Sequence, residues 1–498
     1  MEELIKRFKE RLAKIKAYNH AMGVLYYDSE TVMPRAASDG LGKTLGVLSE
    51  QVYNLTVDES FKADINEILA HKDEVDFITR REAEELSEEL EQMASIPVDE
   101  YVAFQVAVND AGNAWHEAKE KSDYSIFEPH LAKLVDYTIR FAKYQKPDMP
   151  VYDALLDKYE KGLNVETLDR FFMDVRSKLV PVIQDIAKKG RPIDDSFLNK
   201  KYDIAKQREF SEYLMDVLTL DKSRCVLGET EHPFTTGFTK NDVRITTHYH
   251  ESMVASSMYS VIHEGGHALY EQNIGDDIKD SPLGGGSSMG IHESQSRLYE
   301  NLIGRSEEFI SYIFPKMQEL FPEQLKGVTA HDMYLAVNKS VPSLIRTEAD
   351  ELTYPLHIMV RYELEKKLMT GEISTKQLPL EWNRLYKEYL GVDVPSDREG
   401  LLQDSHWSGA SFGYFPSYAI GSAYGVQMIE AMKKDIDVFG LVRAGDMKPI
   451  VNWLTDRIYK YGCLYKPNEL VKNACGADFD PSFYTDYLEK KFRTIYDI

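Results

Sequence analysis

The sequence is poor in cysteine and has no long apolar run. Only three of its 498 residues are cysteines, Cys225, Cys463 and Cys475, an odd and widely spaced set. So few thiols argue against a disulfide framework and fit a reducing compartment. No apolar run is long enough to cross a bilayer, and the charged amino-terminal segment lacks the apolar centre of a secretory signal. We therefore expect a cytoplasmic protein.

Basic residues are also in short supply relative to acidic ones. The chain has 59 lysines and arginines against 82 aspartates and glutamates, a formal net charge of -23. Such an excess of negative charge repels phosphate backbones and anionic lipids, and no basic cluster offsets it. We expect neither a nucleic-acid partner nor a membrane partner.

Most of the sequence has the periodicity of amphipathic helices, with apolar residues recurring every three or four positions. Residues 3–27, for example, place Leu4, Phe8 and Leu12 on one stripe between charged residues. The same pattern predicts helices at about 80–120, 128–146, 165–189, 205–219, 306–320, 355–370, 376–390, 420–434 and 482–495.

One region changes to the period of a strand. Residues 242–250, "DVRITTHYH", alternate β-branched with polar side chains, and residues 232–239 precede them by a short turn. This pattern predicts a β-hairpin. We therefore expect a mainly α fold over residues 1–498 as a single domain, with two lobes around a cleft and a small sheet at its edge.

The stretch "SVIHEGGHALYEQ", residues 260–272, is typical of a metal site. On a helix, His263 and His267 share one face, and Glu264 flanks them. Two neutral imidazoles can bind a divalent ion while the carboxylate takes a proton from the attacking water. The alternative is two histidines with other partners, but the apolar flanks predict a buried helix, where unpaired polar groups are costly.

The two glycines between these histidines weaken a helix by up to about 1 kcal/mol each relative to alanine. Something other than helix stability must therefore require small residues at Gly265 and Gly266. We expect either a second helix or the substrate backbone to approach closely at this point.

A third ligand is needed for a tetrahedral ion that keeps one position for water. Residues 290–301, "GIHESQSRLYEN", follow a glycine-rich loop and predict a new helix whose first turn holds His292 and Glu293. Glu293 is the better candidate, because two histidines and one glutamate are a common hydrolytic ligand set. The alternative is an acid favoured at a helix start by the helix dipole.

Short motifs occur in a fixed order along the chain. They are "HPF" (232–234), "DVRIT" (242–246), "HEGGH" (263–267), "HESQS" (292–296), "IRTEAD" (345–350) and "GLLQDSHW" (400–407). With this ordered set, the sequence resembles the carboxypeptidase Taq family of cytosolic metallocarboxypeptidases, also called thermostable carboxypeptidase 1, over nearly its whole length.

The resemblance implies removal of single residues from the carboxyl termini of peptides, with broad specificity and proline disfavoured. It implies one divalent ion, zinc or cobalt, held by His263, His267 and Glu293, with Glu264 as the general base. It also implies a helical saddle with a deep groove, shared in outline with angiotensin-converting enzyme and neurolysin, and a homodimer.

An exopeptidase must bind a free carboxylate, and the arginine fork suits that task. Arg346 is the candidate within its motif, and a structural pair with Glu348 or Asp350 is the alternative. Arg244 and Arg361 are competing candidates.

The reaction also needs a hydrogen-bond donor for the developing oxyanion. Residues 403–422 contain His406, Tyr414 and Tyr418. In the saddle-shaped relatives a histidine followed by a tyrosine does this work, so the resemblance implies this role for His406 and Tyr414, with Tyr418 as a substrate contact. The alternative is that these rings only pack in the core.

His232 and the strand predicted at 242–246 are expected to line the groove. An extended substrate could pair with the edge of that strand, or Asp242 and Arg244 could only hold the sheet to a helix. The sequence leaves these two open.

Two other functions remain alternatives to a carboxypeptidase. A dipeptidyl carboxypeptidase or oligopeptidase of related fold uses the same chemistry in a groove closed differently. A non-catalytic, metal-bound scaffold for peptides has no need of Glu264, whose presence therefore argues against it.

Overall fold

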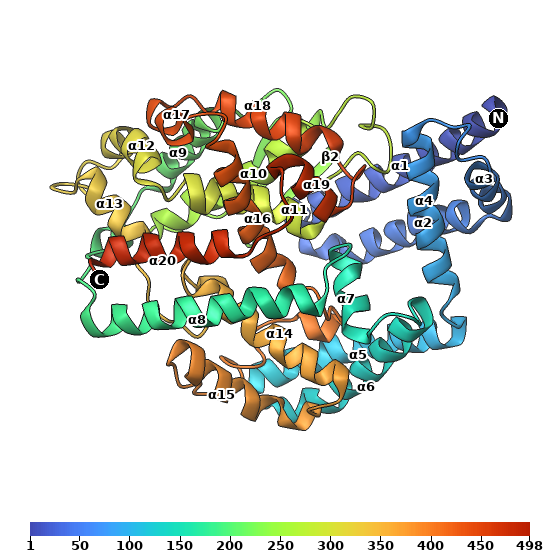
Figure 1. Ribbon diagram of the computed structural model, residues 1–498, viewed down its shortest axis with the longest axis horizontal. Coiled ribbons are helices and arrows are strands. Elements are labelled where there is room, and N and C mark those ends of the chain that lie inside the picture. The colour runs from blue at the N-terminus through green and yellow to red at the C-terminus, as the bar shows by residue number, and fades with distance from the viewer.

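A computed structural model describes residues 1–498 as a mainly helical protein (Figure 1). The α-helices are α1 (Glu2–Thr31), α2 (Ser38–Val57), α3 (Glu59–Ala70), α4 (Phe77–Ala94), α5 (Val98–Lys121), α6 (Tyr124–Gln145), α7 (Val151–Tyr159), α8 (Val165–Lys189), α9 (Ile204–Val217), α10 (Val254–Gln272), α11 (Met289–Arg297), α12 (Glu307–Leu320), α13 (Ala330–Val337), α14 (Tyr354–Thr370), α15 (Leu378–Leu390), α16 (Pro416–Met432), α17 (Val438–Ala444), α18 (Lys448–Arg457), α19 (Pro467–Cys475) and α20 (Ser482–Tyr496). The strands are β1 (Cys225–Glu229), β2 (Thr235–Thr239) and β3 (Asp242–Thr247).

The helices predicted from periodicity are confirmed, with one difference. The pattern over residues 80–120 belongs to two helices, α4 and α5, which are separated at Ser95–Pro97. Proline has no N–H to donate and disfavours helical geometry in the residue before it, so the chain turns here and a second helix begins at Val98.

The predicted hairpin is confirmed as β2 and β3, which pair antiparallel. A further strand, β1, pairs parallel with β3, so the strand order is β1-β3-β2. Because β3 lies in the middle, both of its edges are already paired. Of the two alternatives for this strand, pairing of an extended substrate with its edge is therefore excluded, and β2 is the edge strand of the hairpin.

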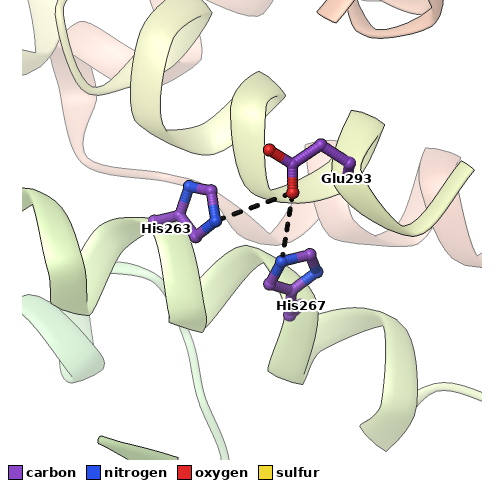
Figure 2. Close-up of side chains that lie close together, drawn as sticks. All are labelled: His263, His267 and Glu293. Atoms are coloured by element: carbon purple, nitrogen blue, oxygen red, sulfur yellow. Dashed lines mark ion pairs between the residues drawn. The ribbon is translucent and has the colours of Figure 1, made fainter. Parts of the chain in front are cut away.

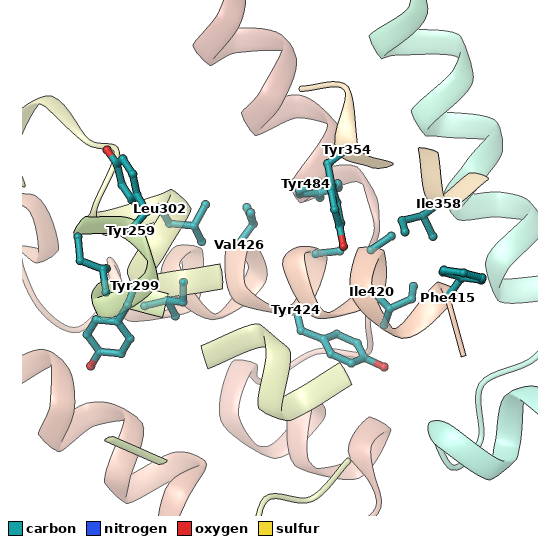
Figure 3. Close-up of a cluster of buried hydrophobic side chains, with 14 of the residues drawn as sticks. Tyr259, Tyr299, Leu302, Tyr354, Ile358, Phe415, Ile420, Tyr424, Val426 and Tyr484 are labelled. Carbon is teal, nitrogen blue, oxygen red and sulfur yellow. The ribbon is translucent and has the colours of Figure 1, made fainter. Parts of the chain in front are cut away.

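The main core is built around α16, in which 15 of 17 residues are buried. A helix that is apolar on all sides belongs in the interior of a large protein. Figure 3 shows buried side chains gathered around it, including Tyr354 and Ile358 from α14 and Tyr484 from α20. Helix α11 packs directly on α16, so the segment that carries Glu293 is anchored in this core.

A second, much smaller core lies among α1, α3 and α4, at the end of the molecule that holds the amino terminus (Figure 1). It contains seven buried residues: Leu4, Phe8, Leu12, Phe61, Ile65, Ile68 and Ala83. The neighbouring α2 has no buried residue at all. No helix of the protein combines the length and the apolar character needed to cross a membrane.

Candidate metal centre

Helix α10 carries both histidines, and its glycines allow two other elements to come close. A Cβ added at Gly266 would stand 2.7 Å from the carbonyl oxygen of Gln295 and 2.8 Å from the Cα of Ser296, both main-chain atoms of α11. At Gly265 the same atom would meet Leu218 at 2.6 Å. The expected close approach of a second helix is therefore confirmed.

Helix α11 is clamped from its other side by α16. A Cβ added at Gly421 would lie 2.9 Å from both the Cβ of Glu293 and the carbonyl oxygen of Gly290. The start of α11 is fixed as well, because the Ser288 side chain accepts from the N–H of Ile291 and caps the helix. These contacts leave α11 little freedom to rotate, so Glu293 is aimed at α10.

The three predicted ligands converge on one point (Figure 2). The Nε2 atoms of His263 and His267 lie 3.8 and 3.6 Å from Oε2 of Glu293, and the three atoms all lie within 4.8 Å of one another. Ligand atoms about 2.1 Å from a tetrahedral ion stand roughly 3.4 Å apart. The donor set and its spacing thus fit a divalent cation, although the ligand roles themselves remain predictions.

The side chains of Glu300 and Arg297 orient His263 and Glu293 from the side away from the metal position. Nδ1 of His263 donates to Glu300 at 2.8 Å, and Arg297 bridges Glu293 at 2.7 Å and Glu300 at 3.1 Å. Burial alone would raise the pKa of Glu300, but Arg297 and His263 lower it to about 2. Glu300 is therefore a charged acceptor that holds the His263 ring with Nε2 toward Glu293.

Sequence reasoning missed Arg297 and Glu300, although a signal was present. They lie four and seven residues after Glu293, the spacing of one helical face. Glu300 itself sits in a wider turn, the π-helix η3 (Leu298–Ile303) that continues α11. Such turns often occur at functional sites.

The second histidine is held by a different arrangement. Nδ1 of His267 lies 2.7 Å from Nδ1 of His292, and Nε2 of His292 lies 2.8 Å from Oε1 of Glu271. The sequence pattern put His292 in the same helical turn as Glu293 but gave it no role, and Glu271 was not singled out.

Glu264 is buried beside this cluster and is held by the sheet. Only 6% of the residue is exposed, and its Oε2 accepts a hydrogen bond of 2.6 Å from the Thr235 hydroxyl of β2. Burial raises the pKa of Glu264, which strengthens it as a proton acceptor near neutral pH. Thr235 directly follows the "HPF" motif, so the motif marks the position of this contact.

These groups open into a cavity of about 690 Å³. Thr235 and Gly237 of β2, together with Pro233 and Phe234 just before it, line one side, so the sheet lies at the edge of the cleft as predicted. Tyr414 and Tyr418 also line it. Two lysines in its wall, Lys158 and Lys466, have no carboxylate partner, whereas the other basic residues there are paired. The cavity wall therefore contains both the candidate metal ligands and two lysines that are free to pair with an anionic group of a substrate.

His406 lies beneath the two tyrosines rather than in the cavity wall. Its ring centroid is 5.3 Å from that of Tyr414 and 6.3 Å from that of Tyr418. Burial lowers the pKa of His406 to about 4, so the imidazole is neutral at pH 7. Its Nδ1 is buried and has no hydrogen-bond partner.

Arg346 is 6% exposed and pairs with neither of the acids considered from sequence. Its Nε and Nη2 donate to Asp404 at 3.1 and 2.8 Å, and not to Glu348 or Asp350. Arg361, one of its predicted competitors, binds the other oxygen of Asp404 at 2.7 Å. Two of the three candidate arginines therefore meet on one carboxylate.

Arg346 nevertheless stays close to the cavity. Its guanidinium stacks 5.2 Å from the ring centroid of Tyr418, and its Nη1 donates to the hydroxyl of Tyr354 at 3.3 Å. These bonds use only part of its five donors.

His232 and Arg244 lie outside the cavity. His232 is exposed, and Arg244 makes a bidentate pair with Asp242 at 2.9 Å. The Arg244 guanidinium also stacks on Tyr27 of α1 and Phe238 of β2. These contacts favour the alternative in which Asp242 and Arg244 hold the sheet to a helix, and a substrate role for His232 and Arg244 stays a prediction.

Comparison with known proteins agrees with the resemblance read from the motifs. The model of the family described as "Carboxypeptidase Taq (M32) metallopeptidase" matches residues 7–492. The chain is 39% identical to carboxypeptidase 1 of Bacillus subtilis, over 99% of this chain and 98% of that protein. It is 36% identical to thermostable carboxypeptidase 1 of Pyrococcus furiosus, over 98% of each.

Solved structures agree with the sequence comparison. The M32 carboxypeptidase of Deinococcus radiodurans R1 superposes with a TM-score of 0.96 at 31% identity, over 100% of both chains. The converging histidines and glutamate lie in a fold that matches these enzymes along its whole length. The chain therefore belongs to the carboxypeptidase Taq (M32) family and is a metallocarboxypeptidase that acts on peptides with a divalent metal.

Proposed function

We propose that this enzyme removes single residues from the carboxyl termini of peptides, with broad specificity and proline disfavoured, and that residues 1–498 act as one catalytic domain. We propose zinc as the metal, with cobalt as a substitute, held by His263, His267 and Glu293. The observation that carries the proposal is the convergence of two imidazole nitrogens and one carboxylate oxygen beside buried Glu264. This donor set is typical of catalytic zinc.

A divalent ion bound there supplies Lewis-acid polarisation of the scissile carbonyl and lowers the pKa of water. Glu264 takes the proton of the attacking water on its carboxylate and passes it to the leaving nitrogen. Thr235 holds that carboxylate through its hydroxyl. The carboxylate therefore has a fixed orientation throughout the proton transfers.

His406 and Tyr414 donate hydrogen bonds to the oxyanion that develops on the carbonyl oxygen. The lowered pKa of His406 supports this role, because a neutral imidazole keeps one N–H to donate. In the present geometry Tyr414 lies in the cavity wall and His406 behind it, so His406 must reach the substrate past the tyrosine rings.

We propose Arg346 as the group that binds the terminal carboxylate, with Tyr418 packed between it and the cavity. Lys158 is the competitor, because it lines the cavity and has no carboxylate partner, with its ammonium over the ring of Tyr159. Arg346→Met and Lys158→Met separate the two, with kcat/KM measured on a free-acid peptide and on its carboxyl-amide. The variant of the true anchor loses the preference for the free acid, and the other variant keeps it.

We place the extended part of the peptide along β2. This strand is the free edge of the hairpin, and Gly237 within it lines the cavity. Main-chain hydrogen bonds to a strand edge hold a peptide with little dependence on its side chains, which supports broad specificity.

The decisive experiment is the Glu264→Gln variant, analysed by mass spectrometry of a peptide ladder before and after removal of the metal with a chelator. We expect zinc to stay bound and the rate to fall at least about 100-fold, as loss of a general base requires. Glu59→Gln, on the exposed surface of α3, is the matched control and should cleave normally.

Each alternative predicts a different ladder. Steps of two residues would indicate a dipeptidyl carboxypeptidase, and equal cleavage of the free acid and the amide would indicate an oligopeptidase. A protein that binds zinc but leaves the peptide intact would be the non-catalytic scaffold. Near-normal turnover by Glu264→Gln would refute the mechanism.

We also propose a cytoplasmic homodimer. Three free, scattered cysteines support a reducing compartment. Helix α5 supports self-association, because Val98, Val102 and Val106 recur every four residues on one face and are 79%, 56% and 55% exposed. Val102→Glu should shift the protein toward monomer in analytical ultracentrifugation, and an unchanged dimer would exclude this face.

A further inference from the structure

The two imidazoles at the candidate metal site are supported in different ways. His263 donates directly to the buried carboxylate of Glu300. His267 instead contacts another histidine, His292, which in turn contacts Glu271. The second arrangement is a chain of two hydrogen bonds, 2.7 and 2.8 Å long.

The proton positions along this chain follow from its chemistry. Nε2 of His267 faces Glu293 and the metal position, so its proton is on Nδ1. Nδ1 of His292 must then accept, which leaves the proton of His292 on Nε2, where it donates to Glu271. Each ring nitrogen is thereby assigned once Nε2 of His267 binds the metal.

Packing prevents the His292 ring from turning away. A Cβ added at Gly286 would stand 2.2 Å from Cδ2 of His292, and the ring of Tyr270 lies 5.1 Å away between centroids. Glu271 is confined too, because a Cβ added at Gly237 of β2 would meet its Oε2 at 2.8 Å. The loop before α11 and the edge strand therefore fix both members of the chain.

We infer that His292 and Glu271 form a positioning pair that fixes the ring of His267 for metal binding. The inference rests on the proposed metal site. Partners of this kind set the tautomer and raise the basicity of a metal-binding histidine, and their loss typically weakens metal binding 10- to 100-fold. His292 is a positioning residue here, because it acts on the metal only through His267.

The test is a zinc titration of the metal-free protein against a competing chelator, with no substrate present. His292→Ala and His292→Leu both remove the acceptor for His267, so each should weaken zinc binding about 10- to 100-fold and speed zinc release to the chelator. Leucine restores most of the volume of the ring, so equal losses in the two variants separate hydrogen bonding from packing.

His292→Asn is the conservative variant. Its side-chain oxygen stands near the position of the imidazole Nδ1 and can accept from His267, so it should recover most of the affinity. Glu271→Gln keeps a hydrogen-bonding group at the far end of the chain and should have a smaller effect than His292→Ala. This graded order is not expected if His292 only fills space.

The matched control is His331→Ala. His331 contacts Glu307 at the same 2.8 Å through Nδ1, but both side chains are more than half exposed and neither contacts a candidate ligand. Its zinc affinity should equal that of the wild type. Thermal unfolding of each metal-free variant, followed by circular dichroism, shows whether the fold is kept.

Zinc affinity of folded His292→Leu within threefold of the wild type would overturn the inference, as would equal losses in the alanine and asparagine variants. Failure of the wild type itself to bind zinc would instead contradict the proposed function. The two failures are therefore distinguishable in one experiment.

Discussion

Helices α10 and α2 are nearly equal in length, with 19 and 20 residues, but their surroundings differ completely. In α10, 13 residues are buried, and in α2 none is. Both contain glycines that weaken a helix. A Cβ added at either glycine of α10 would lie within 2.8 Å of main-chain or leucine atoms. A Cβ added at Gly40, Gly42 or Gly46 of α2 would have no neighbour within 4 Å. The same residue type is thus required by packing in one helix and by nothing visible in the other.

The largest expected effect on the metal site comes from adding a side chain at the crowded glycine. Gly266→Val drives its Cβ into the backbone of α11, so α11 and Glu293 must move away from α10. Overpacking of this kind typically costs about 1–3 kcal/mol or more. We expect loss of zinc binding in the chelator titration together with a lower unfolding midpoint. Gly46→Val is the matched control and should keep the zinc affinity of the wild type. Unchanged zinc affinity in Gly266→Val would show that the close packing at Gly266 does not position Glu293.

The small core of the amino-terminal helices should respond locally. Phe61 is 1% exposed and stacks on Phe8, so Phe61→Ala should destabilise this region by about 3–5 kcal/mol. Hydrogen exchange should show opening of α1, α3 and α4, while zinc affinity stays unchanged. Phe309→Ala in the large core should open the whole molecule instead, and identical exchange patterns would show that the two cores unfold together.

Buried carboxyl groups give the central region a pH dependence. Glu365 accepts from Trp407, Gly413 and Tyr152, but burial dominates and raises its pKa to about 7. The folded state therefore keeps a proton that the unfolded chain releases near pH 4.5. The stabilisation from this proton is complete below about pH 4.5 and is lost as the pH rises through about 7.

Urea unfolding of the wild type and Glu365→Gln at pH 5 and pH 8 measures this contribution. The stability difference between the two proteins should change by up to about 3 kcal/mol, with the wild type losing relative stability at the higher pH. Glu59→Gln, exposed on α3, should show no such change. A constant difference between wild type and Glu365→Gln would mean that the carboxyl is already charged at pH 5.

The smallest effect is expected in α2. Gly46→Ala places a methyl group in open space and removes backbone freedom from the unfolded chain, so it should stabilise the protein by up to about 1 kcal/mol. A measurable loss of stability in urea unfolding would mean that α2 is covered, for example by a second copy of the chain.

Local patterns in the sequence were sufficient for the parts of the site that lie on one element. The shared face of His263 and His267 and the hairpin could be predicted, because each depends on helix or strand period. The close approach of another helix at Gly266 could be predicted, because glycine weakens a helix. Strand β1 was missed, since its five residues, "CVLGE", show no clear alternation and its parallel pairing with β3 is a distant contact.

The supporting contacts of the site could not be predicted, because they join segments that are far apart in the chain. Arg346 meets Asp404 across 58 residues, and His263 meets Glu300 across 37. A list of motifs contains both members of the first pair but does not say that they touch. The roles of His232, Arg244 and Arg346 therefore depend on measurements rather than on spacing.

The main-chain contact of α11 with Gly266 on one side and Gly421 on the other has a practical consequence for enzyme redesign. The spacing between the helices that carry the imidazoles and the carboxylate is set in part by main-chain atoms, which side-chain substitutions elsewhere leave in place. Libraries that seek a new preference for the terminal residue should therefore keep both glycines and vary wall residues without a proposed binding role, such as Lys466.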